Sequence, residues 1–355
     1  MLTSEKNKIS YLHFIMSVLV ILIHSINNES RFERFFSIDN SIGQFAVPLF
    51  FIISGFLFFR NIKSMNDAKL KLRKRVYTLL IPYLLWNLIY YMIHLLLKPG
   101  SGISLGEMID AAFTYRYNPA FWFMYQLILL SIISPIMYYV VNNFFVRTIK
   151  NYRKIIMTIA LCLIAELAVV LGKDIAYINE DAFIYYTFGM LLSILYNDGK
   201  IFLVSKKNII KFLIAFAITF ALNRYIFHLL LNGFDCYNVF TATIIIVRLI
   251  GAMVIFYLVD LFFRYRNVPE FMTQTFFLYA IHYMIVKAMI IFTKYFMYKF
   301  VPVGIVINGV DLYTIIECIV FAISPVVCII INYYLSRFLM KKFTKQYNIL
   351  VGNRR

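Results

Sequence analysis

The sequence predicts an all-α integral membrane protein, a polytopic bundle of about ten transmembrane helices with both termini in the cytoplasm. Apolar and aromatic residues make up 62% of the 355 residues and only 15% are charged, whereas soluble domains are roughly 45–50% apolar. The apolar residues form continuous blocks of about 18–25, the length that a helix needs to cross the hydrocarbon core. Backbone polar groups in lipid must pair within helices or a closed barrel, and continuous blocks exclude the short alternating strands of a barrel.

Each expected membrane helix corresponds to one apolar block. The blocks are residues 9–27, 42–59, 76–97, 121–141, 155–171, 182–196, 209–231, 239–261, 271–297 and 312–336. The longest connecting segments, 28–41, 60–75 and 98–120, are expected to be loops, with a short interfacial helix within 107–117. The first block lacks a small-x-small cleavage site, which predicts a retained helix. No soluble appendage interrupts the blocks, so residues 1–355 are expected to form one membrane-embedded domain.

The basic residues are concentrated in alternate connections. The formal net charge is +18, and most of the 35 lysines and arginines lie in 60–75, 147–154, 200–207, 264–266 and the tail from 337 to 355. This is the positive-inside pattern, which places these segments and both termini in the cytoplasm. The basic character therefore reports topology, and no nucleic-acid partner is predicted. The expected location is the inner or plasma membrane, in contact with lipid.

The four cysteines are scattered without paired spacing, so neither a metal site nor a disulfide framework is predicted. Chemistry is expected instead from polar groups within the membrane, where they are expensive to place. His13 and His24 are eleven residues apart, which returns the helix to within about 20° of the same direction after a rise of about 16 Å. With an ordinary pKa of about 6.5, His24 can accept a proton from a hydroxyl. The alternative is a histidine that packs between helices and bonds a carbonyl.

Five sequence landmarks resemble the acyltransferase-3 family of integral membrane acyltransferases. They are residues 11–24 with 47–59 (VPLFFIISGFLFF), 74–87 (KRVYTLLIPYLLWN), 122–127 (WFMYQL) followed by Ser134 and Pro135, 275–282 (TFFLYAIH) and 348–354 (NILVGNR). Their order along most of the chain makes the resemblance specific. It implies transfer of an acyl group, often acetyl, from cytoplasmic acyl-CoA to a hydroxyl of a carbohydrate, a lipid-linked glycan or another envelope molecule. Acyl-CoA is then a co-substrate, and no cofactor is expected to be bound permanently.

Two positions depart from the family's pattern. Family members pair an arginine with the histidine eleven residues later, and His13 stands at the arginine position while His24 is kept. Tyr125 and Gln126 stand where many members carry arginine and aspartate. Both changes leave the proposed base intact, and they bear on how the donor is held, on its identity and on activity itself.

The predicted catalytic residues are His24 as general base and His282. Preorganised donors stabilise the charge that grows on the thioester carbonyl oxygen, and His282, Asn87, Trp122 and Tyr279 are the candidates. Arg73 and Arg75, with His13 at the same inner mouth, are expected to bind the phosphates of CoA, unless these arginines only anchor the topology. Arg248 is expected to face the interior, where it contacts substrate or pairs with an acid such as Glu166 or Glu317.

Two other functions stay open. A transporter or flippase of a lipid-linked glycan would line a path with the interior charges, although the sequence contains no repeat of the kind that such folds carry. A catalytically silent family relative would explain the changes at residues 13, 125 and 126. The acceptor, the acyl chain length and the oligomeric state are left open by the sequence.

Overall fold

The computed structural model describes residues 2–25, 42–98, 104–143, 153–171, 177–199, 208–263, 267–302, 305–307 and 310–353. The elements in chain order are α1 (Thr3–Ser25), a 3-10 turn (Ile42–Phe45), α3 (Ala46–Phe59), α4 (Met65–Arg75), a π-helical turn (Val76–Leu80), α5 (Ile81–Leu97), α6 (Leu105–Phe113), a 3-10 turn (Pro119–Phe121), α7 (Trp122–Asn143), α8 (Arg153–Val170), α9 (Glu180–Asn197), α10 (Asn208–Leu231), α11 (Tyr237–Phe262), a 3-10 turn (Glu270–Met272), α12 (Thr275–Phe300), β1 (Val306–Ile307), β2 (Val310–Asp311), α13 (Leu312–Lys342) and α14 (Thr344–Leu350).

Every predicted apolar block contains a helix. Within the described residues, seven helical segments are long and apolar enough to cross a membrane: the segments that contain α1, α5, α7, α10, α11, α12 and α13. The other three blocks form α3, which has 14 residues, and α8 and α9, which have 18 residues each and begin with charged side chains. The chain is thus a helical membrane protein, while the count of ten crossings stays a prediction. The antiparallel hairpin β1–β2 is a small addition to the expected all-α fold.

The prediction of a loop over 60–75 is wrong, because residues 65–75 form α4. Ser64 caps this helix by accepting the Asp67 N–H, and the Asp67 carboxylate accepts the Ser64 N–H, which is a capping box. The helix continues through the π-helical turn into α5, so the basic residues lie on a helical extension. The short helix expected within 107–117 is present as α6. The predicted loop 28–41 lies outside the described residues.

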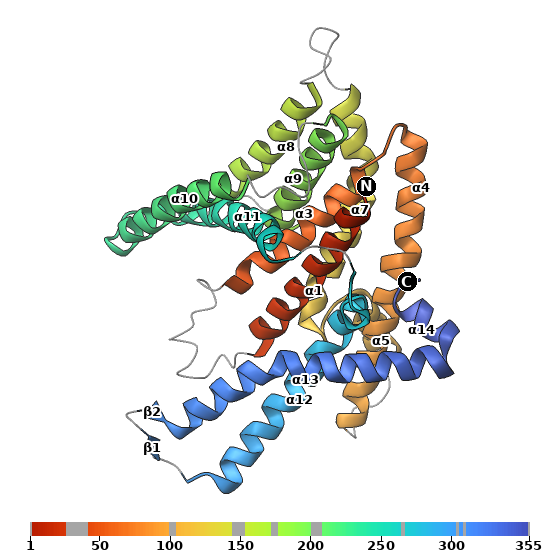
Figure 1. The fold of residues 1–355 in the computed structure, drawn as a ribbon, viewed down its shortest axis with the longest axis vertical. Helices are drawn as coiled ribbons and strands as arrows, with labels where there is room; N and C mark the ends of the chain where they lie inside the picture. Colours follow the sequence, from red (N-terminus) through yellow and green to blue (C-terminus); the bar gives the residue numbers. More distant parts are fainter. Residues whose placement is uncertain are drawn as a thin grey trace.

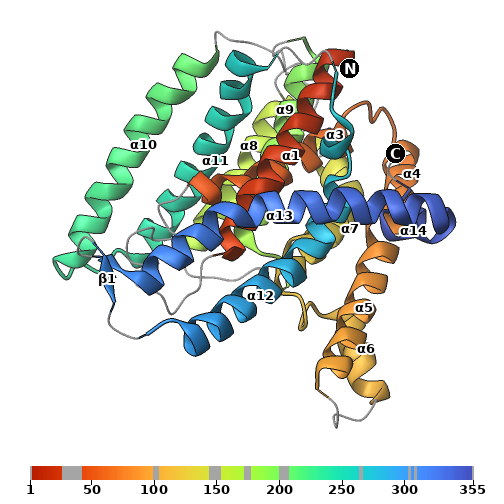
Figure 2. The same ribbon diagram turned by 60° about the horizontal axis from the view of Figure 1, so that its bottom comes forward.

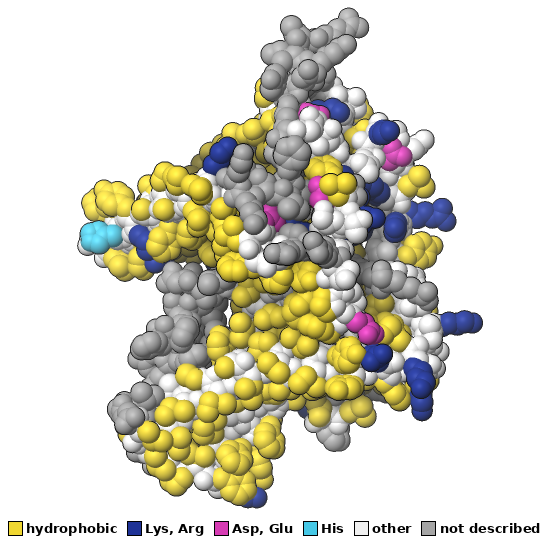
Figure 3. All heavy atoms as spheres, viewed as in Figure 1, with side chains coloured by type: hydrophobic (Ala, Val, Ile, Leu, Met, Phe, Trp, Pro, Cys, Tyr) yellow, Lys and Arg dark blue, Asp and Glu magenta, His cyan; other side chains and the backbone are white. Residues whose placement is uncertain are grey.

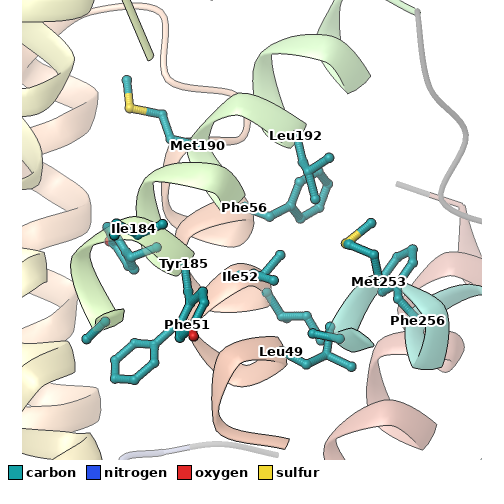
Figure 4. Packing of buried hydrophobic residues seen from close by; sticks show 14 of the residues in the cluster. Leu49, Phe51, Ile52, Phe56, Ile184, Tyr185, Met190, Leu192, Met253 and Phe256 are labelled. Carbon is teal, nitrogen blue, oxygen red and sulfur yellow. The ribbon is translucent and has the colours of Figure 1, made fainter. Parts of the chain in front are cut away.

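Close contact between α3 and α9 forms the centre of one buried cluster. A Cβ on Gly55 would lie 2.1 Å from the Tyr186 backbone oxygen, and a Cβ on Gly189 would lie 2.1 Å from the Ile52 backbone oxygen. The two glycines therefore let the backbones touch, as small residues do in membrane bundles. Apolar side chains of α3, α9 and α11 pack around this contact (Figure 4).

Helix α1 runs through the middle of the fold, with α10 and α11 as a pair on one side and α12 and α13 as a pair on another (Figures 1 and 2). It contributes Leu12 and Met16 to the α3–α9 cluster and Ile21 to a second cluster around α5 and α12. Near its start, Lys8 Nζ lies 2.9 Å from Asp260 of α11, with both side chains fully buried. These contacts hold α1 between the two halves of the bundle.

The outlying helices present apolar surface. Large apolar side chains of α10 and α13, such as Ile218 and Val326, are more than half exposed, and in a bilayer they would contact lipid. Figure 3 shows apolar side chains over the α10–α11 and α12–α13 pairs, whereas lysines and arginines gather towards the side of α4 and α14. On the face that Figure 3 shows, apolar side chains therefore cover the two helix pairs, and most of the basic side chains lie towards α4 and α14.

Candidate active site

His24 and His282 face each other where α1 meets α12. Their ring centroids are 5.3 Å apart, and the Tyr283 ring meets His24 edge-on at 5.6 Å. His24 is in the last turn of α1, and His282 lies in the first half of α12. The fold thus brings together two predicted candidates that are far apart in the chain.

The hydrogen bonds of His282 determine which of its nitrogens can accept a proton. Its Nδ1 lies 2.6 Å from the Tyr279 carbonyl oxygen, and a carbonyl can only accept, so Nδ1 carries the hydrogen. The neutral ring then has its lone pair on Nε2. This Nε2 atom is buried without a hydrogen-bond partner among the described residues, on a side chain with no exposed surface. A buried acceptor without a partner is costly, which marks a functional position.

A cavity of about 650 Å³, called the central cavity below, opens among α1, α3, α7, the start of α12 and the C-terminal segment. Its polar lining includes His13, Arg75, Gln274, Tyr279 and Asn348. Tyr279 is the residue whose carbonyl holds His282, so the cavity reaches to within one helical turn of the histidine pair. Its volume lies in the range of about 300–1,000 Å³ that is typical of small-molecule sites.

His13 lines the central cavity from α1. Its ring stacks on Phe50 of α3 at a centroid distance of 5.6 Å, and Ser10 and Ser17 line the cavity from the same helix. Because His13 belongs to the cavity while His24 contacts His282, the two histidines of α1 serve different parts of the site.

Arg75 and Arg73 are separated by the structure. Arg75 lines the central cavity at the end of α4 and is half-buried, whereas the Arg73 side chain is exposed and does not line the cavity. Residues two apart on a helix point in different directions, so one helix cannot present both guanidinium groups to the same cavity here. Arg75 is the cation that can meet an anion inside.

Besides His282, the three candidates for stabilising the carbonyl oxygen have different surroundings. Tyr279 lines the cavity, but its hydroxyl donates to the Ala120 carbonyl. Asn87 is buried, donates to the Tyr83 carbonyl at 2.9 Å and leaves its Oδ1 without a partner. The Trp122 ring packs on Phe51 of α3 at 6.2 Å and does not line the cavity. None of the three therefore offers a hydrogen-bond donor to the central cavity as it stands.

The prediction that Arg248 pairs with Glu166 or Glu317 is wrong. Its guanidinium Nη1 lies 3.6 Å from the Asp181 carboxylate of α9, where Glu166 or Glu317 had been expected. Glu166 lies close enough for Asp181 to influence it electrostatically, but Arg248 is paired with Asp181 because α9 and α11 both pack against α3. Arg248 is not part of the central cavity or of the histidine pair.

Tyr125 and Gln126 line a second pocket of about 470 Å³, separate from the central cavity. The Gln126 side chain donates to the Tyr177 carbonyl at 3.3 Å and accepts the Asn179 N–H at 3.0 Å. Phe123 and Met124, the two residues before them, line the central cavity. The first turn of α7 therefore forms a wall between the two spaces, and the departures at residues 125 and 126 lie on the far side of it.

Sequence reasoning missed two amide side chains that line the cavity. Gln274, just before α12, and Asn348, in α14, both line it. The resemblance of 348–354 to the family's ending was a signal that this segment matters, but nothing in the sequence placed it at the central cavity. Across the described residues, no group of three or more histidine, cysteine, aspartate or glutamate side chains could hold a metal ion.

Comparison with known proteins identifies one family. The profile of the acyltransferase-3 family, described as an acyltransferase domain, matches residues 7–333, which is nearly the whole chain. Neither the curated proteins nor the solved structures provide a match.

Proposed function

Because the chain belongs to the acyltransferase-3 family and is a multi-pass membrane acyltransferase, we propose that it moves an acetyl group from cytoplasmic acetyl-CoA to a hydroxyl group. The acceptor is a carbohydrate, free or lipid-linked, or another molecule of the cell envelope, and the enzyme works in the cell membrane. The observation that carries the proposal is the His24–His282 pair, with its unpartnered Nε2, one helical turn from a cavity that contains a cation.

The donor side of the proposal rests on the central cavity. Acyl-CoA carries phosphates, and the guanidinium of Arg75 suits them through its planar set of donors. His13, at the position of the family's arginine, lines the same cavity. Acyl-CoA is a co-substrate in this scheme, so no permanently bound cofactor is involved.

The direction of donor entry follows from the charge pattern. The cavity is lined by the N-terminal half of α1, the end of α4, residues 270–277 and the C-terminal segment. These are the parts that the positive-inside pattern assigns to the cytoplasmic side. The proposed topology, with both termini in the cytoplasm and ten crossings, therefore opens the cavity to cytoplasmic acyl-CoA.

The proposed chemistry is a direct transfer assisted by His24. The acceptor oxygen attacks the thioester carbonyl carbon while a nitrogen of His24 takes the hydroxyl proton, a step for which a positioned base contributes roughly 10²–10⁴-fold. The tetrahedral intermediate then collapses, the carbon–sulfur bond breaks, and the imidazolium returns the proton to the CoA thiolate. The products are an ester and free CoA.

His282 has a positioning role in this scheme. The lone pair on its Nε2 can accept the N–H of His24 after a small rotation of the His24 ring, since the two rings are already neighbours. That bond would leave the other nitrogen of His24 as the acceptor that faces substrate. The arrangement follows the general rule that a base is oriented by a third group, here the Tyr279 carbonyl acting through His282.

The test measures transfer from radiolabelled acetyl-CoA by membranes that contain each variant, together with the mass of the envelope glycan in cells with and without the gene. His24→Ala should lower the rate by about 10²-fold or more. His94→Ala is the matched control, because His94 contacts Tyr117 and lies outside the site. Full activity of inserted His24→Ala protein would refute the base assignment, and no transfer by the unchanged protein would favour the catalytically silent relative.

A further inference from the structure

The C-terminal segment 343–353 forms one wall of the central cavity. Thr344, Tyr347, Asn348 and Val351 line it, together with Met340 from the end of α13. The family match ends at residue 333, so this wall lies beyond the matched region. The position of the segment next to α4 and α5 is visible in Figure 2.

Three contacts hold the segment in place. The Trp86 indole N–H donates to the Leu350 carbonyl at 3.0 Å, and the Tyr347 ring packs on Phe277 at 5.3 Å. Gly352 has a φ of +66°, and a Cβ there would lie 2.5 Å from the Thr78 backbone oxygen. Because other residues rarely adopt this φ and a Cβ would clash at this distance, a glycine at 352 is suited to docking the segment closely.

The docking point connects the wall to the cation of the cavity. Thr78 lies in the π-helical turn that directly follows Arg75. The same few residues therefore position the guanidinium of Arg75 and receive Gly352. A displacement of the C-terminal segment would change the shape of the cavity next to its positive charge.

Asn348 contributes an uncharged amide to this wall. Its side chain is half-buried and lines the cavity, and within the described residues no hydrogen bond occupies it. Its backbone carbonyl accepts the Asn353 N–H at 2.7 Å, which holds the turn after α14. Gln274, the other amide of the cavity, already uses its oxygen to accept the Ser336 hydroxyl. With respect to the described residues, the Asn348 side chain is therefore open as both donor and acceptor.

The chemistry of acyl-CoA matches these two kinds of lining group. Its nucleotide end carries phosphates, which call for a cation, whereas its pantetheine arm is uncharged and contains two amides and a hydroxyl. An asparagine side chain offers a carbonyl oxygen and an NH₂ group, and so can pair with an amide of the arm. The cavity contains both features, in Arg75 and Asn348.

We propose that the C-terminal segment 343–353 completes the donor site and that Asn348 binds an amide of the pantetheine arm. This inference rests on the proposed function, because it assumes an acyl-CoA donor. It assigns a wall of the donor site, and Asn348 as a residue that determines specificity, to a segment outside the family-matched residues 7–333.

The experiment measures equilibrium binding of two probes to the purified full-length protein in detergent. The probes are CoA, which has the arm, and adenosine 3′,5′-bisphosphate, which lacks it. Asn348→Ala should weaken CoA binding by about two- to tenfold, the worth of one hydrogen bond, and leave adenosine 3′,5′-bisphosphate binding unchanged. The control is Gln346→Ala, which removes an exposed amide from the same helix and should change neither.

Each outcome is decisive. Equal CoA binding by the Asn348→Ala and Gln346→Ala proteins would overturn the role of Asn348, and so would an equal loss of both probes. Gly352→Val should weaken both probes by displacing the wall, and normal CoA binding by this variant would overturn the role of the segment. If the unchanged protein binds no CoA, the proposed function itself fails, which is distinct from a failure of this inference.

Discussion

The buried Lys8–Asp260 pair gives the sharpest prediction about stability. Lys8 Nζ lies 2.9 Å from both carboxylate oxygens of Asp260, and neither side chain has exposed surface. The ammonium also lies 3.9 Å from the centre of the Phe256 ring. Lys8→Met keeps the length of the side chain but leaves the Asp260 carboxylate buried without its cation. Breaking a buried pair in this way costs about 3–5 kcal/mol.

Asp260→Asn should cost less than Lys8→Met. Glu5 lies within electrostatic reach of Lys8 on the same helix, so the lysine keeps one negative neighbour, and the face of the Phe256 ring still attracts it. The double variant Lys8→Met/Asp260→Leu should be close to neutral, because it removes both charges and fills the space with apolar atoms.

The assay is reversible unfolding of the purified protein in detergent micelles, followed by tryptophan fluorescence. The chain has two tryptophans, Trp86 and Trp122, and both lie within the bundle. With the single variant Asp260→Leu added, the unchanged protein, Lys8→Met, Asp260→Leu and the double variant form a double-mutant cycle, whose interaction energy isolates the pair. Single substitutions that each cost less than about 1 kcal/mol, as for an exposed pair, would refute the reasoning, and so would a double variant as unstable as the sum of the two.

Two further predictions concern packing and donor binding. Gly55→Ala should destabilise the fold by about 3 kcal/mol or more, because its Cβ would lie 2.1 Å from a backbone oxygen of α9. The control is Gly106→Ala, whose Cβ would meet nothing nearer than 3.7 Å and which should leave the unfolding curve unchanged. Equal unfolding curves for the two variants would contradict the predicted contact. Arg75→Ala should raise the KM for acetyl-CoA at least about tenfold, since it removes charge-assisted hydrogen bonds. Arg73→Ala should leave this KM unchanged, because Arg73 is outside the cavity. An equal rise in KM for both variants would mean that simple surface charge is responsible.

The positions of the helices were predicted well from composition and periodicity. The run 47–59 is apolar and uncharged, and it lies within α3. The prediction of a loop over 60–75 is wrong because a charged stretch is compatible with a helix that is capped at its start. The capping residues of α4, Ser64 and Asp67, are present in the sequence and predict the start of a helix. Greater weight on that local pattern would have predicted α4.

The candidate site was predicted only in part. His24 and His282 were both chosen, from helix spacing and from a family resemblance, and the structure brings them into contact. The pairing of Arg248 with Asp181 could not be predicted, because the acid lies on a helix far away in the chain. Asn348 was missed as a lining residue for the same reason. The catalytic and donor-binding roles of all these residues stay predictions that the experiments above test.

The amino-acid sequence by itself determined that this protein is a helical membrane protein of the acyltransferase-3 family, and it determined where nearly all of the helices lie. This is possible because each helix satisfies its backbone hydrogen bonds within a few residues, and because the requirement for apolar length in lipid is a local property. Only the tertiary structure decided which faces meet. Contacts such as Gly55 with α9, Arg75 with the central cavity, and residue 352 with Thr78 depend on side-chain shape across helices distant in sequence, and no local pattern encodes that shape.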